Sequence, residues 1–495
     1  MEHGGGSSPR TGSGGDHEAI WLGVDLGTQG VRVIAATGDG QVVARAGVAL
    51  TSVRDGHRHE QDPEDWWSAF IRAAGSATRD LDSARIRGLS VCSTSGTVLF
   101  VESAGDEPSR PVSPALMYDD GRAVEYADRI GQAPAPGWLT AGARPQVTWG
   151  LAKALWLLDH ADVPRRARLA HQADVVTSRL VGVPVATDWS HALKTGVDLE
   201  TGEWPVDVLE RCGLDAARLP AVVPPGAILG AVGAGAAALT GIPAGTQVFA
   251  GLTDGCAAQV ASGALAVGSW NFVLGTTLVL KGATKEPLRD PSGAVYSHRS
   301  PDGTWWPGGA SSAGAGALAA EFGSADLASL DEAAAAREPA GCLRYPLVGT
   351  GERFPFRRAD AVGFTVGSPR DDADRYAALL QGVAFVERLS LDHVRGLGAS
   401  VGTSVRLTGG GTRSAYWCQL QADILGGEVV VPEVADGAFG MAVLAARSAY
   451  GSLEDAAAKM VRIRGRFVPR AEASERLSEA YVRWRAELRS RGWLS

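Results

Sequence analysis

Cysteine is scarce in this chain and scattered where it occurs. Of the 495 residues five are cysteine, and none forms a CxxC pair or stands near a histidine at metal-ligand spacing. They are Cys92, Cys212, Cys256, Cys342 and Cys418. This usage excludes a disulfide scaffold and argues against a structural zinc site. We therefore expect a reduced, cytoplasmic protein.

Long apolar runs and an excess of basic charge are also missing. The longest Ala/Gly-rich run, residues 231–241, is shorter than the roughly 20 residues that a membrane-spanning helix needs. Residues 1–17 are rich in Gly and Ser and lack the apolar core of a signal peptide, so we expect a disordered tail. The net charge of −8 disfavours a nucleic-acid-binding surface. The sequence predicts neither membrane nor nucleic acid as a partner.

The tripeptide Leu-Gly-Thr occurs twice in strand-like surroundings, at Leu26-Gly27-Thr28 and at Leu274-Gly275-Thr276. Such a turn between β-branched runs is typical of a hairpin whose backbone N–H groups and threonine hydroxyl can hold a phosphate. Two copies suggest a duplicated fold that holds one polyphosphate from both sides. Only the first copy carries an acid, Asp25, which suggests a metal on that side. A phosphotransferase is therefore the leading hypothesis.

The length predicts two domains rather than one core. The pattern predicts a strand meander over residues 20–48, a helix that starts at Asp62-Pro63, and a long amphipathic helix over residues 371–397. We place the domains at residues 18–247 and 248–495. The last helix, about residues 470–490, is a candidate for packing back on the first domain.

Two aspartates are candidates for chemistry. Asp25 follows a buried strand, where a carboxylate is costly unless it binds a metal, a substrate hydroxyl or a backbone cap, and an Asx-type turn explains it equally well. Asp254 stands at a strand-to-helix turn among small residues that leave room for a ligand. The alternative for Asp254 is a plain helix N-cap.

A glycine turn, Gly409-Gly410-Gly411, lies between a predicted strand and a predicted helix. Glycine allows close backbone approach, and the helix N-terminus offers amides to phosphate or ribose. The turn is neither GxGxxG nor the Walker A pattern, so a Rossmann or P-loop site is poorly supported.

Several motifs together resemble the FGGY family of sugar kinases, in the family's order and over about residues 20–450. They are Gly23-Val24-Asp25-Leu26-Gly27-Thr28, residues 59–67, Tyr118-Asp119-Asp120-Gly121-Arg122, Thr187-Asp188-Trp189-Ser190-His191-Ala192, Gly251-Leu252-Thr253-Asp254-Gly255, residues 381–388 and Thr408-Gly409-Gly410-Gly411. The family's late Glu-Ala-x-x-x-Gly signature reads Asp436-Gly437-Ala438-Phe439-Gly440 in this chain.

The resemblance implies an α/β, duplicated ribonuclease-H/actin-like fold, in which ATP and sugar meet in the cleft between two domains. It implies that Asp254 is the catalytic base and that Asp25 lies near Mg²⁺, the substrate and the transferred phosphate. It further implies sugar contacts from Ser95, Asp120 and Asp254. The implied ATP-binding residues are Thr28, Gly275 and Thr276 in the hairpins, and Gly410, Gly411, Ser414 and Trp417 in the adenosine-binding turn and helix.

The sugar loop departs from the pattern of the family's xylulose kinases, which usually show Ser-Gly-Gln-Met-His-Gly there. This chain has Ser93-Thr94-Ser95-Gly96-Thr97 and, downstream, Tyr118-Asp119-Asp120-Gly121-Arg122, which is similar to the D-ribulose kinases of cyanobacteria and plants. We rank phosphorylation of D-ribulose to D-ribulose 5-phosphate first and D-xylulose second. The rival from another class is a non-catalytic actin-like ATP-binding assembly protein. A homodimer is a fair expectation.

Overall fold

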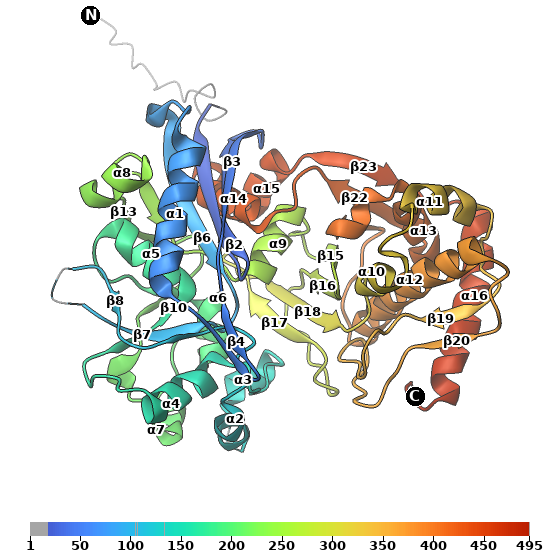
Figure 1. The fold of residues 1–495 in the computed structure, drawn as a ribbon, viewed down its shortest axis with the longest axis horizontal. Coiled ribbons are helices and arrows are strands. Elements are labelled where there is room, and N and C mark those ends of the chain that lie inside the picture. Colours follow the sequence, from blue (N-terminus) through green and yellow to red (C-terminus); the bar gives the residue numbers. More distant parts are fainter. Residues whose placement is uncertain (1–17, 104, 106, 133, 495) are drawn as a thin grey trace, which may run out of the picture.

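Two mixed β-sheets organise the chain, one in each of the two lobes of Figure 1. The computed structural model describes residues 18–103, 105, 107–132 and 134–494. The tail predicted over residues 1–17 lies outside the described residues.

The sheet of the first lobe has the strand order β13-β14-β6-β1-β2-β3. Its strands are β1 (Ile20–Leu26), β2 (Gly30–Thr37), β3 (Val42–Ala49), β6 (Ile86–Ser93), β13 (Ile228–Ala231) and β14 (Gln247–Phe249). Strand β1 is buried along its whole length and pairs with β2 in antiparallel and with β6 in parallel fashion, as its nearly continuous apolar sequence favours. Strand β3 alternates between exposed and half-buried residues because it forms the sheet edge. The predicted meander is confirmed.

The sheet of the second lobe repeats this path, with the order β17-β18-β16-β15-β21-β22-β23. Its strands are β15 (Trp270–Leu274), β16 (Leu278–Gly282), β17 (Tyr296–Arg299), β18 (Trp305–Ser311), β21 (Ser404–Thr408), β22 (Glu428–Pro432) and β23 (Ile463–Phe467). The antiparallel run β15-β16-β18, followed by the parallel strands β21 and β22, corresponds to β1-β2-β3 followed by β6 and β14. The predicted duplicated ribonuclease-H/actin-like fold is confirmed.

Helices in equivalent places cover the two sheets. They are α1 (Pro63–Thr78) and α5 (Gln172–Val181) in the first lobe, and α12 (Asp372–Gly396) and α13 (Ala415–Leu425) in the second. Asp62 caps α1 by accepting a hydrogen bond from the backbone N–H of Glu64 at 2.9 Å, and Pro63 occupies the first helical position, as the sequence predicts.

The remaining elements form the lower part of the first lobe and the surface of both lobes. In the first lobe they are β4 (Val53–Asp55), β5 (Arg58–Gln61), β7 (Val98–Glu102), β8 (Arg110–Pro111), β9 (Ala115–Leu116), β10 (Arg168–His171), β11 (Thr187–Asp188), β12 (Val222–Val223), α2 (Val124–Gly131), α3 (Pro136–Thr140), α4 (Gly150–His160), α6 (Trp189–Ala192), α7 (Val206–Cys212) and α8 (Ala234–Thr240). Later in the chain they are α9 (Asp254–Ser262), α10 (Gly316–Phe322), α11 (Leu327–Ala335), β19 (Leu343–Tyr345), β20 (Phe364–Val366), α14 (Gly437–Tyr450), α15 (Leu453–Met460) and α16 (Ala471–Ser490). Short 3₁₀-helices include η2 (Leu193–Thr195) and η4 (Gly410–Arg413).

Helices α9 and α14 connect the two lobes. Helix α14 follows β22 of the second sheet, yet it packs against α9 and against β1 and β6 of the first sheet, beside the blue strands of Figure 1. Glycine makes this close packing possible: a Cβ at Gly23 would collide with the carbonyl oxygen of Ala438, and a Cβ at Gly440 with that of Ala257.

Replacing Gly440 by alanine is expected to lower the free energy of unfolding by about 1–3 kcal/mol, because the new methyl group overpacks the contact between α14 and α9. Gly235→Ala in α8 is the matched control, because nothing lies within 4 Å of a Cβ there, and it should stabilise by up to about 1 kcal/mol through helix propensity. Urea denaturation measures both. A Gly440→Ala protein as stable as the Gly235→Ala protein would contradict this packing.

The structure corrects two predictions about the domains. Strand β14 pairs with β6 in the first sheet, so the predicted division at residues 247/248 falls inside a strand of the first lobe, and the second sheet starts only at Trp270. Helix α16 packs on α13 and β19 of the second lobe, not on the first, because its buried side chains Leu477, Tyr481 and Trp484 belong to the second-lobe core.

In the part of the chain that the structure describes, no helix combines the length and apolarity that crossing a bilayer requires.

Candidate active site

Asp254 lies at the start of α9, on the floor of the cleft between the lobes. Thr253, not Asp254, is the N-cap residue of α9, and among the described residues the Asp254 carboxylate accepts a hydrogen bond only from the adjacent Gly255 N–H, at 2.7 Å. The carboxylate is open to the cleft, yet the surrounding protein displaces enough water to raise its pKa, against the opposing effects of the Gly255 N–H and of the charges on Lys194, His191 and Lys281. The N-cap alternative therefore does not explain this residue.

Ser95 lies in the loop that follows β6 and lines a cavity of about 400 Å³ together with Asp254. Its hydroxyl oxygen is buried and has no hydrogen-bond partner among the described residues. The neighbouring Thr94 hydroxyl is fixed by the side-chain oxygen of Gln172 at 2.7 Å. Gly96 turns the chain with a φ of +95°, and a Cβ there would lie 2.9 Å from the Thr148 carbonyl oxygen. The loop thus holds one buried hydroxyl without a partner beside the cavity.

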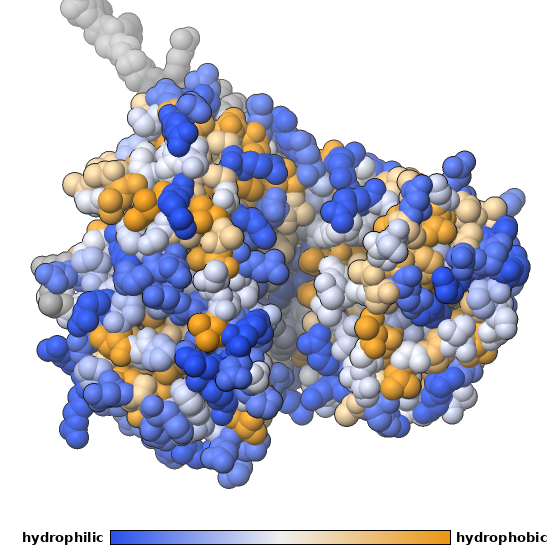
Figure 2. All heavy atoms as spheres, in the orientation of Figure 1, coloured by the Kyte–Doolittle hydropathy of each residue, from blue (hydrophilic) through white to orange (hydrophobic). Residues whose placement is uncertain are grey.

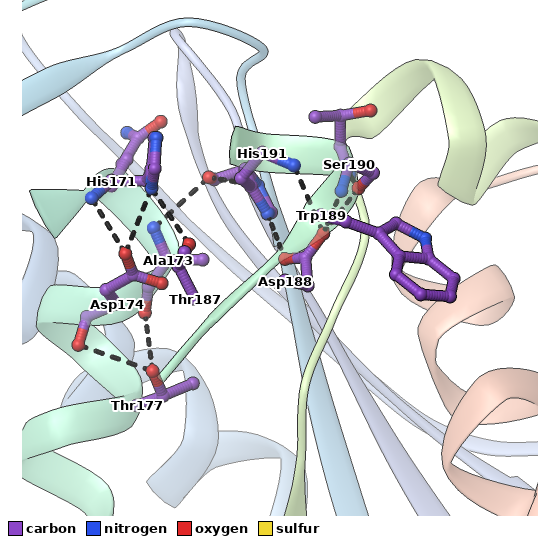
Figure 3. Close-up of polar contacts among 12 residues, drawn as sticks. His171, Ala173, Asp174, Thr177, Thr187, Asp188, Trp189, Ser190 and His191 are labelled. Carbon is purple, nitrogen blue, oxygen red and sulfur yellow. Dashed lines mark hydrogen bonds and ion pairs between the residues drawn. The ribbon is translucent and has the colours of Figure 1, made fainter. Parts of the chain in front are cut away.

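A buried polar chain ties the Ser95 loop to Asp254, and Figure 3 shows its central residues Asp188, Ser190 and His191. The His191 ring bonds the Asp188 carboxylate through Nδ1 and the Ser93 hydroxyl through Nε2, the latter at 2.8 Å. Asp188 also accepts the Ser190 hydroxyl at 2.6 Å, and the Ser190 oxygen in turn accepts the Thr253 N–H at 2.9 Å. One ion pair therefore positions both Ser93, two residues before Ser95, and Thr253, directly before Asp254.

The charge state of this chain follows from its burial and pairing. Burial acts against the ionised forms of both groups, but the mutual attraction outweighs it: the pKa of His191 is raised and the pKa of Asp188 is lowered. His191 with both nitrogens protonated can donate to Asp188 and to Ser93 at once.

Asp120, predicted to contact the sugar, is fully buried beside the cleft rather than lining it. Its carboxylate accepts the His59 backbone N–H at 2.8 Å and the Arg122 guanidinium at 2.8 Å. The preceding residues Tyr118 and Asp119 line the cleft instead. Asp120 thus fixes the backbone conformation of residues 118–122, and Tyr118 and Asp119 line the cleft.

The second lobe supplies the opposite wall of the cavity. Its side chains come mainly from β15, β16 and β17 and include Asn271, Lys281, Tyr296 and His298. A second cavity of about 470 Å³ shares Tyr118, Lys194, Tyr296 and Ala310 with the first, so the two are adjacent. Figure 2 shows the surface hollowed between the two lobes.

Asp25 lies at the end of β1, close to two further carboxylates. It is bound by the Arg32 guanidinium at 3.0 Å and contacted by the Cys92 thiol at 3.6 Å. Burial raises its pKa, Arg32 opposes the rise, and the charges of Asp254 and Asp436 add to it. The structure therefore brings Asp25, Asp254 and Asp436 together, with Asp436 directly before α14. Among the described residues no group of three or more His, Cys, Asp or Glu side chains has the geometry to hold a metal ion alone.

Both Leu-Gly-Thr turns join two antiparallel strands, but their backbone hydrogen bonds differ. Gly27 N–H bonds the Gly30 carbonyl at 3.0 Å, and Gly275 N–H bonds the Thr277 carbonyl at 3.1 Å. Thr28 is half-buried, and Thr276 is exposed at the tip of the β15–β16 hairpin. The Thr276 carbonyl accepts the Gly316 N–H, which fixes the second turn to the start of α10. The predicted hairpins are confirmed as structures, and their phosphate role stays a prediction.

The predicted adenosine-binding residues divide into two groups. Gly410 is exposed and Gly411 is buried against Leu274, in 3₁₀-helix η4. The Ser414 hydroxyl is occupied as the cap of α13, accepting the Trp417 N–H at 2.9 Å. Trp417 is 1% exposed and lies in the second-lobe core. Only Gly410 of these four is fully open to a ligand in this structure.

Comparison with known proteins decides the family. The sequence profile of the N-terminal domain of the FGGY family of carbohydrate kinases matches residues 20–261, and that of the C-terminal domain matches residues 270–449. The chain belongs to the FGGY family of carbohydrate kinases. This membership makes it an ATP-dependent sugar phosphotransferase.

Relatives of the kinase align over almost its full length. It is 31% identical to the xylulose kinase of Streptomyces coelicolor over 92% of this chain and 93% of that protein, and 27% identical to the xylulose kinase of Bacillus subtilis over 91% and 93%. Among solved structures, the Brucella ovis protein described as a xyloylose kinase superposes with a TM-score of 0.83 at 26% identity, covering 96% of this chain and all of that one. Plasmodium falciparum glycerol kinase, at 16% identity and a TM-score of 0.80 over 94% of this chain and 98% of that one, shares the fold.

Several residues of the kinase site escaped the sequence prediction. Asp188 and His191 stand in a recognised motif, but no pattern says that they join Ser93 to Thr253. The sequence carried one signal for Lys281, because this lysine interrupts a strand that is otherwise apolar or small; β17, which holds His298, has no such pattern.

Proposed function

We propose that the kinase phosphorylates the terminal hydroxyl of a ketopentose, with D-ribulose ranked first and D-xylulose second. The observation that carries the proposal is the pairing of a carboxylate that caps no helix, Asp254, with an unsatisfied hydroxyl, Ser95, on one cavity. A sugar hydroxyl group offers both the proton that Asp254 can accept and the lone pairs that Ser95 can bind.

The chemical step we propose is in-line transfer of the γ-phosphoryl group of ATP. The sugar hydroxyl oxygen attacks phosphorus, the bond to the ADP oxygen breaks, and the hydroxyl proton passes to Asp254. The hairpin turns at Thr28 and Thr276, with Gly275, would hold the phosphates, and the turn at Gly410 and Gly411 the adenosine. Closure of the cleft would exclude water and limit wasteful hydrolysis of ATP.

Asp25 fits a magnesium ion that arrives with the nucleotide. Burial raises the pKa of Asp25, Arg32 opposes the rise, and the carboxylates of Asp254 and Asp436 add to it, so three carboxylates act at this point against one guanidinium group. Magnesium commonly takes one or two protein carboxylates and completes its shell with phosphates and water. The bound ion would neutralise charge on the phosphates during transfer.

Replacing Asp25 by asparagine is expected to raise the Mg²⁺ concentration needed for half-maximal stabilisation by ATP by about 10-fold or more, because a carboxylate contact to the cation is lost. A magnesium titration of thermal unfolding in the presence of ATP measures this shift. Asp55→Asn, which changes an exposed carboxylate of β4, is the control. An unchanged magnesium midpoint in Asp25→Asn would remove Asp25 from the metal role.

The ranking of the two sugars is tested by a coupled assay of ADP release. The short side chains of residues 93–97 support D-ribulose, whereas the names of the relatives support D-xylulose as the second candidate. Purified protein is assayed with pentuloses, hexuloses, polyols and glycerol. A clear preference for xylulose or glycerol would overturn the ranking. ATP hydrolysis that no sugar stimulates would instead favour the actin-like assembly protein.

We further propose a cytoplasmic, homodimeric protein. The five cysteines are free and buried in the described chain, which supports a reducing compartment. Light scattering coupled to size exclusion tests the dimer.

A further inference from the structure

Lys281 and His298 form a buried pair on the second-lobe wall of the sugar cavity, on strands β16 and β17. They are 6% and 3% exposed, and Lys281 Nζ lies 3.1 Å from His298 Nδ1. An ammonium group can only donate, so Nδ1 is the acceptor and the ring hydrogen of neutral His298 lies on Nε2. This Nε2 is buried and has no partner among the described residues. The cavity wall therefore carries an N–H donor that nothing in the described protein satisfies.

The ammonium groups at this cavity also lack carboxylate partners. Within the described ranges, neither Lys281 nor Lys194 has an Asp or Glu oxygen within 4.0 Å. Lys194 donates instead to the Ser95 carbonyl at 3.2 Å. Buried charges are normally paired, because an unpaired one loses its hydration without compensation. Among the described residues that line this cavity, Asp254 is the one carboxylate and faces two lysines, while Asp119 lines the neighbouring cavity.

We propose that Lys281 and His298 form a carboxylate-binding subsite, and that the cavity accepts sugar acids as well as neutral sugars. A carboxylate supplies the negative charge that Lys281 lacks and the acceptor oxygen that His298 Nε2 lacks. The transfer is unchanged: a hydroxyl group of the acid attacks the γ-phosphorus, ADP leaves and the proton passes to Asp254. The carboxylate takes no part in bond making. The inference thus rests on the proposed function for the base and goes beyond it for the substrate class.

The electrostatics of the pair agree with this assignment. Burial and the nearby charges of Lys281 and Lys194 hold the pKa of His298 well below its usual range, so the ring stays a neutral N–H donor. Burial and Lys281 lower the pKa of Lys194, which Asp254 opposes. The lysines therefore supply the positive charge that attracts the ligand carboxylate, and the imidazole N–H supplies a hydrogen bond that orients it.

Matched ligands that differ only in the acid group test the subsite without catalysis. Isothermal titration of the full chain, without ATP, compares D-ribonate with ribitol and D-gluconate with D-glucitol. At least one acid should bind about 10-fold or more tightly than its alditol, because a charged hydrogen bond contributes roughly 1.5–3 kcal/mol. If neither acid is preferred by that factor, the proposal is overturned, and this result needs no variant.

Variants then locate the effect. Lys281→Gln should abolish the preference for the acid, whereas Lys285→Gln, an exposed lysine just beyond β16, should keep it. His298→Gln, which retains an N–H donor, should keep more of the preference than His298→Phe. A preference unchanged in Lys281→Gln would overturn the subsite. If Lys281→Gln lowers kcat for a neutral ketopentose without changing acid binding, the ammonium group serves the transferred phosphoryl group and the proposal fails. Turnover of ketopentoses in the wild type reports separately on the proposed function.

Discussion

Replacing Asp254 by asparagine is expected to lower kcat by about 10²–10⁴-fold while ATP binding stays near that of the unchanged kinase. The amide has the same shape and can still accept the Gly255 N–H, but it cannot take a proton from the sugar. Thr253 occupies the N-cap position of α9, and the amide oxygen of the variant can keep the bond to the Gly255 N–H, so the helix start should persist.

Steady-state ADP release and equilibrium nucleotide binding measure the two parts of this prediction. Asp207→Asn is a matched control, because Asp207 stands in the first turn of α7, outside the cleft. It should leave both measurements unchanged. An Asp254→Asn protein that keeps a large share of its turnover would remove Asp254 from the base role.

The same carboxylate sets the acid side of the pH profile. Burial raises the pKa of Asp254 above the ordinary value of 3.8, and the base must be ionised to accept a proton. The value of kcat/KM should therefore fall as the pH falls through this raised pKa, at a higher pH than an ordinary aspartate would give. The residual activity of Asp254→Asn should lack this decline.

Replacing His191 by leucine is expected to lower the free energy of unfolding by about 3–5 kcal/mol and to raise the KM for the sugar. The change leaves the Asp188 carboxylate buried without its charged partner, which is the costly way to break a buried ion pair. It also removes the hydrogen bond to Ser93, which holds the loop that presents Ser95. The KM for ATP should stay near the wild-type value, since the hairpin turns are untouched.

Chemical denaturation and sugar kinetics test this role together. His191→Gln, which can still donate to Ser93, should recover part of the sugar KM, a recovery that a purely structural role would not produce. The exposed His57, changed to leucine, is the control. Equal sugar KM values for wild type and His191→Leu would show that the chain does not position the loop.

The stabilisation by this ion pair has a defined pH window. The raised pKa of His191 gives stability that is full below the unfolded value of 6.5 and is lost as the pH rises through the folded pKa. The lowered pKa of Asp188 gives stability that is full above 3.8 and is lost as the pH falls through its folded pKa. The pair should therefore contribute most between about pH 4 and 6.5, and the stability difference between wild type and His191→Leu should be largest there.

Sequence patterns predicted those helices and strands that interactions between neighbouring residues determine. The apolar run of β1, the cap at Asp62 and the long helix α12 each follow from neighbouring residues. The duplication was visible because the same turn, Leu-Gly-Thr, ends equivalent strands in both sheets. The domain division was placed too early because β14 is short, and its partner β6 lies far back in the sequence.

The site was less predictable because distant segments build it. Asp119 and Asp120 are neighbours in the sequence, and only the fold tells them apart. Asp120 is hydrogen-bonded to His59 and Arg122, whereas Asp119 lines the cleft. Trp417 stands where the adenosine-binding helix is expected to contact the ligand, yet its side chain is buried in the second-lobe core. Lys281 and His298 come to face Asp254 only after the two lobes assemble.

The position of α14 also determines when the first lobe can be completed during synthesis. The face of β1 that carries Trp21 is covered by α14, residues 437–450, which are made near the end of translation. This apolar face stays uncovered, and open to aggregation with other chains, until almost all of the second lobe has been synthesised. An amino-terminal fragment that stops at the end of α9 would expose the same face permanently. The two lobes share one fold in duplicate, but the first is completed only when α14, from the far end of the chain, has been made.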